Sequence, residues 1–210
     1  PQNPDGTPFY AAEAWDILRL SSKSHWAVPV LAGDTAIWAL AAHPTPPVFD
    51  GPEDRNGTRN ADEIRLLADI ATGAGYVYDD ADVSGGLPEG AAYVMMGDMN
   101  SDPADGDSLP GAVAPLLAAA NTSVTPASEG GPAAAAAQGG ANAGHASDPA
   151  HDTADFGDET PGNLRVDYAL PSPDLQIAGA GIFWPAPGQP GAELVDASDH
   201  RLVWVDIVLP

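Results

Sequence analysis

Polar side chains that could take part in catalysis lie at the ends of three apolar stretches of the chain, the first two after their stretch and the third before it. The first is His43, the second is the pair Asp98 and Asn100, and the third is the pair Asp199 and His200. Such groups at strand ends can bind a hard cation, hold a phosphoryl oxygen or close a turn. Their positions therefore indicate either a functional site or ordinary loop structure.

The stretch before Asp98 is the strongest of these signals. Residues 91–96 are apolar, which predicts a strand buried on both faces, although a buried helical segment has the same pattern. Gly97 leaves the backbone free to turn. The two-residue spacing predicts that Asp98 and Asn100 project to the same side. A plain turn uses the same residue types, so both interpretations stay open at this point.

The other polar groups also have structural explanations when each is taken alone. A single histidine after a strand, such as His43, is commonly a hydrogen-bonding residue of the fold, and the Asp199 and His200 pair can cap a turn. Asp167 and Arg165 lie together on the polar side of a strand predicted over residues 163–170, where the two can form an ion pair. Only their combination favours a site.

The composition restricts the partners of the chain. Thirty Asp and Glu residues stand against seven Lys and Arg residues, of which only Lys23 is a lysine. This balance repels polyanions, so broad nucleic-acid binding through many phosphate contacts is not expected. The absence of cysteine excludes disulfides and thiolate metal sites, and no apolar run is long enough for a membrane span. We expect a monomer, and the acidity fits a secreted or extracellular protein.

Helices are predicted between the strands. The most regular helical spacing covers residues 61–72, where Asn60 and Glu63 resemble a capping box. Shorter helices are predicted within residues 11–20 and 109–120.

Several further strands are predicted from short apolar or alternating runs. They cover residues 27–30, 35–42, 177–184 and 202–208. Pro29 suits a sheet edge, and the last of these strands reads as largely buried. Strands that alternate with helices predict an α/β or α+β class with layered sheets.

Residues 121–160 differ from the rest of the chain. They are rich in Ala, Gly, Ser and Pro and then in acids, which predicts a low-complexity inserted loop, at least partly mobile. We treat this loop as an insertion within one domain that spans residues 1–210.

Taken together, the motifs resemble the endonuclease/exonuclease/phosphatase superfamily, which includes deoxyribonuclease I-like nucleases, sphingomyelinases and inositol-polyphosphate phosphatases. The resemblance rests on His43 and on three motifs in the expected order: Gly97-Asp98-Met99-Asn100, Arg165-Val166-Asp167-Tyr168 and Ser198-Asp199-His200. Residues 43–57 are similar to a secreted-type bacterial branch of uncharacterised members. The resemblance implies a deoxyribonuclease I-like sandwich of two sheets with flanking helices, forming a metal-dependent phosphoesterase.

The resemblance also implies a role for each residue. His200 would activate water, with Asp167 orienting its ring. Asp98 would position the nucleophile or the leaving oxygen, and Asn100 and His43 would stabilise charge on the phosphoryl oxygens and contact the substrate.

The implied metal is a hard cation, Mg²⁺, with Mn²⁺ or Ca²⁺ as substitutes. Asp199 would be a metal ligand or a second orienting group. Arg55 and Arg59 belong to a local basic cluster that would contact phosphate, although ion pairs with the helix acids Asp62 and Asp69 are the more common role of such arginines. The negative charge favours a small or extracellular phosphoester as substrate.

One departure from the family pattern affects the expected activity. Family members begin with two strands that carry an Asn and a metal-binding Glu, and no residue of this chain replaces that Glu. Because residues 1–6 resemble the middle of a loop, we expect an N-terminally truncated sequence with weak or no activity by itself. Two alternatives remain: a non-catalytic binding module on the same fold, and an acidic calcium-binding surface protein suggested by the Asp-rich loops 79–82, 102–107 and 148–158.

Overall fold

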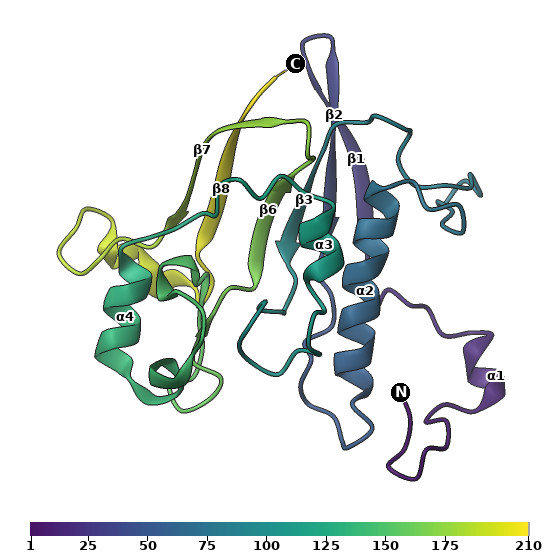
Figure 1. Cartoon of the computed structure of the whole chain (residues 1–210), viewed down its shortest axis with the longest axis horizontal. Coiled ribbons are helices and arrows are strands. Elements are labelled where there is room, and N and C mark those ends of the chain that lie inside the picture. Colours follow the sequence, from purple (N-terminus) through teal and green to yellow (C-terminus); the bar gives the residue numbers. More distant parts are fainter. Residues whose placement is uncertain (210) are drawn as a thin grey trace.

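Four strands form the central sheet of the molecule (Figure 1). The computed structural model describes residues 1–209. Across the sheet the strands follow the order β1 (His25–Ala32), β2 (Thr35–Ala42), β3 (Tyr93–Asp98) and β6 (Asp167–Pro171). Strands β2 and β3 are parallel, whereas β1 and β6 are antiparallel to their neighbours. The ends of β2 and β3 and the start of β6 therefore meet at one edge of the sheet.

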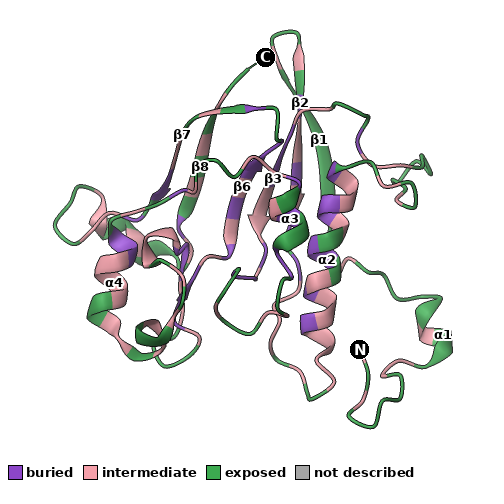
Figure 2. Cartoon of the chain, in the orientation of Figure 1, coloured by how far each residue is buried: buried purple, intermediate pink, exposed green. Residues whose placement is uncertain are grey.

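Helices α2 (Arg55–Ala71) and α3 (Ala114–Ala118) pack on one face of this sheet. Met95 of β3, Leu67 of α2 and Leu116 of α3 are fully buried in the same core cluster. Burial of each such side chain contributes about 1.5–3 kcal/mol to folding. Figure 2 shows that buried residues gather along β3, β6 and α2, whereas β1 at the sheet edge is exposed along most of its length.

Strands β7 (Gln176–Phe183) and β8 (Leu202–Val208) form a second, antiparallel layer. A cleft of about 550 Å³ separates this layer from the central sheet; it is lined by Met96 and Ala169 on one side and by Val203 on the other. Residues of β8 alternate between exposed and half-buried along the whole strand, and none is buried. The prediction that residues 202–208 are largely buried is therefore wrong, while the strand itself has the predicted bounds.

The predicted loop over residues 121–160 contains ordered elements. They are α4 (Gly130–Gln138), two 3-10 helices at Gly140–Gly144 and Pro149–His151, and the short strand β4 (Ala154–Asp155). Gly130 and Gly131 are buried, and a Cβ on them would lie 2.3 Å from the backbone oxygen of Trp184 and 2.1 Å from that of Pro149. These glycines, which indicated a loop, permit close backbone packing instead.

The predicted strand over residues 163–170 is interrupted. It forms β5 (Asn163–Leu164), which pairs with β4, and then β6 in the central sheet. At the break, the amide of Arg165 donates to Asp102 Oδ2 and that of Val166 donates to Thr153 Oγ1, both at a donor–acceptor distance within 2.9 Å. Side chains thus replace the strand partners at this point.

The helices also differ from their predicted bounds. The first is the short α1 (Ala12–Trp15) and α3 is five residues long, both shorter than predicted, whereas α2 begins at Arg55. The capping-box interpretation of Asn60 and Glu63 is wrong, because both are fully buried inside α2. A 3-10 helix at Ala192–Ala197 precedes β8.

The predicted class, mixed α/β with layered sheets and outer helices, is confirmed. None of the helices within residues 1–209 combines the length and the apolar character needed to cross a bilayer.

Candidate active site

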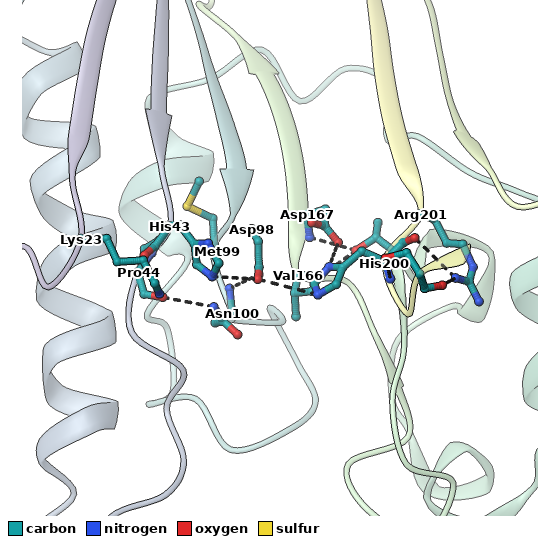
Figure 3. A network of polar contacts seen from close by, with 12 residues as sticks. Lys23, His43, Pro44, Asp98, Met99, Asn100, Val166, Asp167, His200 and Arg201 are labelled. Carbon is teal, nitrogen blue, oxygen red and sulfur yellow. Dashed lines mark hydrogen bonds and ion pairs between the residues drawn. The ribbon is translucent and has the colours of Figure 1, made fainter. Parts of the chain in front are cut away.

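Four polar side chains from separate segments meet where β2, β3 and β6 share an edge (Figure 3). Asp98 Oδ2 lies 3.3 Å from His43 Nε2 and 3.9 Å from His200 Nε2. Asp167 Oδ2 lies 2.9 Å from His200 Nδ1. The chain therefore forms a line of alternating imidazoles and carboxylates, His43, Asp98, His200 and Asp167.

The close approach of β2 and β3 brings His43 to Asp98. Gly97 has a φ of 134°, which favours glycine, and a Cβ at this position would lie 2.1 Å from the backbone oxygen of Ala42. Any other residue would push the end of β2 away. The glycine that was expected only to permit a turn thus sets the distance between the two side chains.

Asp98 and Asn100 form both a turn and part of the site. Asp98 Oδ1 accepts the Asn100 amide hydrogen at a donor–acceptor distance of 2.7 Å, while Oδ2 faces the histidines. Asn100 has a left-handed backbone with a φ of 50°. The predicted projection of both side chains to one side of an extended strand is therefore wrong. The Asn100 amide group instead donates to the backbone oxygen of Pro44 at 3.1 Å, which ties the two strand exits together.

The pairing of Asp167 with His200, 33 positions apart, depends on the segment around β4. Thr153 Oγ1 accepts the backbone amide of Asp167, and the Thr153 carbonyl accepts the amide of Arg201, at 2.9 and 2.8 Å. Ala154 and His200 form an antiparallel bridge. The segment predicted to be a low-complexity loop therefore holds both partners in register.

The contacts of His200 define its proton positions. Asp167 offers only an acceptor when ionised, so the imidazole donates from Nδ1 to Asp167 and leaves Nε2 as a free acceptor. The ring of Phe156 packs edge-on against that of His200, with centroids 5.6 Å apart. The orientation of the imidazole is thus fixed by a hydrogen bond on one side and an aromatic contact on another.

Burial and charge act in opposite directions on this pair. Burial raises the pKa of Asp167, and the hydrogen bond and charge of His200 offset only part of that effect. Burial alone would lower the pKa of His200. The hydrogen bond to Asp167 and the negative charges of Asp167, Asp98 and Asp199 outweigh it, so the pKa of His200 is raised. The carboxylates therefore stabilise the imidazolium form.

The same residues have the donor chemistry of a cation site. One ligand atom from each of Asp98, Asp167 and His200 lies within 4.8 Å of the others. Two carboxylates and an imidazole suit a divalent cation. Within residues 1–209, no other group of three such side chains meets this distance.

Three of the predicted site residues have other positions or contacts. Asp199 is exposed, and its backbone oxygen, rather than its carboxylate, accepts the amide of Asp155. Arg55 forms an ion pair with Glu53, and Arg59 donates to the backbone oxygen of Leu20. The structure thus brings together His43, Asp98, Asp167 and His200, with Asn100 beside them, and not these three.

Two buried residues of α2 support the site. Asn60 Nδ2 donates to the backbone oxygens of Thr45 and Met99 at 2.9 and 2.8 Å, which joins the loop after His43 to the loop after Asp98. Glu63 Oε2 accepts the amide of Thr45 at 2.6 Å.

Part of this support was visible in the sequence. Asn60 and Glu63 lie on the same helical stripe as Ile64 and Leu67, a spacing that places polar groups on a buried helix face. Lys23, the one lysine of the sequence, also borders the site, because its Nζ donates to the backbone oxygen of His43 at 3.2 Å.

Comparisons with known proteins identify one family. The endonuclease/exonuclease/phosphatase family matches residues 21–200. Two solved structures are similar in fold: a family protein from Leptotrichia buccalis, with 15% identity and a TM-score of 0.44, and sphingomyelinase C from Streptomyces griseocarneus, with 14% identity and a TM-score of 0.43. The matches cover 87% and 93% of this chain, which spans 52% and 56% of those proteins. No curated protein matches the sequence.

Proposed function

Because the chain belongs to the endonuclease/exonuclease/phosphatase family, we propose that it hydrolyses a phosphoester with water that His200 activates. The membership confirms the resemblance read from the sequence motifs. The observation that carries the proposal is the Asp167–His200 hydrogen bond of 2.9 Å, which leaves His200 Nε2 facing the Asp98 carboxylate. An oriented imidazole with one free nitrogen beside a carboxylate suits a general base.

In this mechanism, His200 Nε2 removes a proton from water as the oxygen attacks phosphorus and the bond from phosphorus to the ester oxygen breaks. The proton stays on Nε2, and Asp167 stabilises the resulting imidazolium across the Nδ1 hydrogen bond. The leaving alkoxide takes a proton from solvent, to which His200 returns its own after the reaction. Asp98 accepts a hydrogen bond from the attacking water or orients it, and His43, which is half exposed, contacts a phosphoryl oxygen. Catalysis then depends on positioning and charge more than on covalent chemistry.

A divalent cation fits the donor set described above. We expect Asp98 and Asp167 to hold Mg²⁺, with Mn²⁺ or Ca²⁺ as substitutes, and a bound cation would neutralise negative charge on the phosphoryl oxygens. Neutralisation is needed because the chain carries a formal net charge of −23. Without it, the carboxylates would repel an anionic substrate.

The charge also guides the choice of substrate. We expect a small or extracellular phosphoester as substrate, because the overall charge repels long polyanions. We also expect a secreted, monomeric protein, in line with its acidity. Lys23 is a cation beside His43 and a candidate contact for the phosphate group. Contacts to the substrate by Arg55 and Arg59 are not favoured, since both guanidinium groups already bind within the chain.

The test is hydrolysis of bis-p-nitrophenyl phosphate and p-nitrophenyl phosphate by the protein expressed from its complete coding sequence, with Mg²⁺ or Mn²⁺. We expect turnover that is lost in His200→Ala and unchanged in His145→Ala. The preferred ester separates diesterase from monoesterase activity. If a folded protein shows no turnover of either ester, the interpretation as a non-catalytic binding module replaces this one.

A further inference from the structure

A second acidic cluster lies where two loops far apart in the sequence meet. Asp105 Oδ1 accepts the backbone amide of Ala146, and its Oδ2 accepts that of Ser147, at 2.8 and 2.9 Å. Loop 101–108 is therefore fixed against loop 145–153. Two of the Asp-rich segments noted in the sequence thus form one surface, whereas the third, at residues 79–82, shares no hydrogen bond with them among those of the described residues.

Asp152, within this junction, is a buried acid with an unsatisfied oxygen. Its relative exposure is 2%, and among the described residues its Oδ1 has no hydrogen-bond partner. Buried polar atoms without a partner are rare in folded proteins and require an explanation, such as a bound water or ion. Asp102, also buried, differs because its two oxygens accept three backbone amides.

The charges around Asp152 are negative. Burial, and then the charges of Asp102, Asp105 and Asp148, raise its pKa to about 7. No basic side chain contributes to this shift. The carboxyl group therefore faces other acids, and among the described residues no basic side chain offsets its negative charge once it ionises.

The cluster differs from the candidate active site in its chemistry. Its acids offer oxygen ligands, while the imidazoles of His145 and His151 bond the backbone oxygens of Pro161 and Pro126. Within residues 1–209 three of its carboxylates do not converge within 4.8 Å. A calcium ion tolerates this geometry, since it takes six to eight oxygens at flexible angles and accepts backbone carbonyls and waters beside carboxylates. Magnesium suits it less well, because it demands a near-ideal octahedron.

We propose that the junction of loops 101–108 and 145–153 binds a calcium ion, with the carboxylates of Asp152 and Asp102 as ligands and carbonyl or water oxygens completing the shell. The ion would satisfy Oδ1 of Asp152 and balance the surrounding acids. It would also stabilise the position of Thr153, the next residue, whose hydroxyl accepts the amide of Asp167. The site is structural, and it does not depend on the proposed hydrolysis.

The experiment measures thermal unfolding at pH 8 in chelator and with added calcium chloride. Four proteins are compared: the wild type, Asp152→Asn, Asp80→Asn as a control in an exposed acidic loop, and Asp98→Asn to remove a ligand of the candidate active site. With Mg²⁺ in excess to occupy the candidate active site, we expect calcium at about 100 times its Kd to raise the Tm by roughly 5 °C or more above that in Mg²⁺ alone in all except Asp152→Asn. In chelator, Asp152→Asn should melt above the wild type, because an unpaired buried charge is gone.

Equilibrium dialysis with calcium gives a second measurement that does not depend on melting. We expect one calcium ion fewer per chain in Asp152→Asn than in Asp80→Asn. The proposal is overturned if calcium leaves the wild-type Tm unchanged, if the shift persists in Asp152→Asn, or if it disappears in Asp98→Asn. That last result would assign the ion to the strand-end site.

Discussion

Two acidic regions of this molecule differ in what balances their charge. At the strand ends, Asp98 and Asp167 face the imidazoles of His43 and His200. At the loop junction, Asp152 faces only other acids. The two regions are close in the sequence, since Asp98 and Asp102 are four residues apart, but their surroundings give them different chemistry.

The difference concerns the source of the compensating charge. Imidazoles can gain or lose a proton near neutral pH, so the histidines of the strand-end site can themselves take up and release a proton. At the junction, the neighbouring imidazole of His151 bonds the backbone oxygen of Pro126 and does not offset the charge of Asp152. The compensation must therefore come from a proton or a cation taken from solvent. The first arrangement suits catalysis, and the second suits binding of a structural ion. The following predictions test this contrast.

The largest effect is expected from His200→Ala. Removing the base should lower kcat for phosphoester hydrolysis by roughly 10³-fold or more. His145→Ala is the matched control, because its ring bonds the backbone oxygen of Pro161 away from the strand ends. Steady-state kinetics on both variants measures the effect. If His200→Ala keeps more than a tenth of the activity, the strand-end site is not a proton-transfer site.

Asp152 should make the metal-free protein less stable as pH rises. Its pKa is about 7 in the folded chain and near 3.8 when unfolded, so the folded state binds more protons between these values and loses stability from about pH 4 to pH 8. The loss amounts to at most about 4 kcal/mol and is absent in Asp152→Asn. Urea unfolding in chelator measures it. Parallel pH curves for both proteins would contradict the unpaired-charge interpretation.

Asp167→Asn should change the pH dependence of hydrolysis as well as the rate. The raised pKa of His200 places the ascending limb of the wild-type profile above the ordinary histidine value near 6.5, because the base must be neutral. Without the carboxylate this limb should move to lower pH, with kcat lower by roughly 10²-fold. An unchanged midpoint would mean that another group provides the base.

Asn60→Ala should weaken the support of the strand-end site from α2. The carbonyls of Thr45 and Met99 lose their donor, which costs about 1–3 kcal/mol of stability, and kcat should fall because His43 and Asp98 are no longer held together. Asn121→Ala is the control, since its amide donates to Leu175 at a distance from the site. Equal loss of kcat in both variants would show that stability alone is responsible.

The smallest effect is expected from Arg59→Ala. Its guanidinium donates to the backbone oxygens of Arg19 and Leu20, so KM for the phosphoester should change by less than roughly threefold, the scale of a weak exposed ionic contact. A rise in KM beyond tenfold would restore the first interpretation of this arginine as a phosphate contact.

The sequence by itself determined the strands and the residues at their ends. Alternation and apolar runs located β2 and β8 with their observed bounds, and the motifs around His43, Asp98, Asp167 and His200 indicated a common site. These signals are local, because the side-chain period and the turn residues depend only on neighbouring positions in the sequence. They were sufficient for the fold class and for the family.

Only the tertiary structure decided how these residues are held. Asn60 bonds carbonyls 15 and 39 positions away, so the capping pattern around it was misleading. The Ala- and Gly-rich segment read as a loop supplies Thr153, which holds Asp167, and Asp152, whose burial no local pattern reveals. The burial, charges and hydrogen bonds around a carboxylate come from residues far apart in the sequence, so its environment is set only when the chain folds.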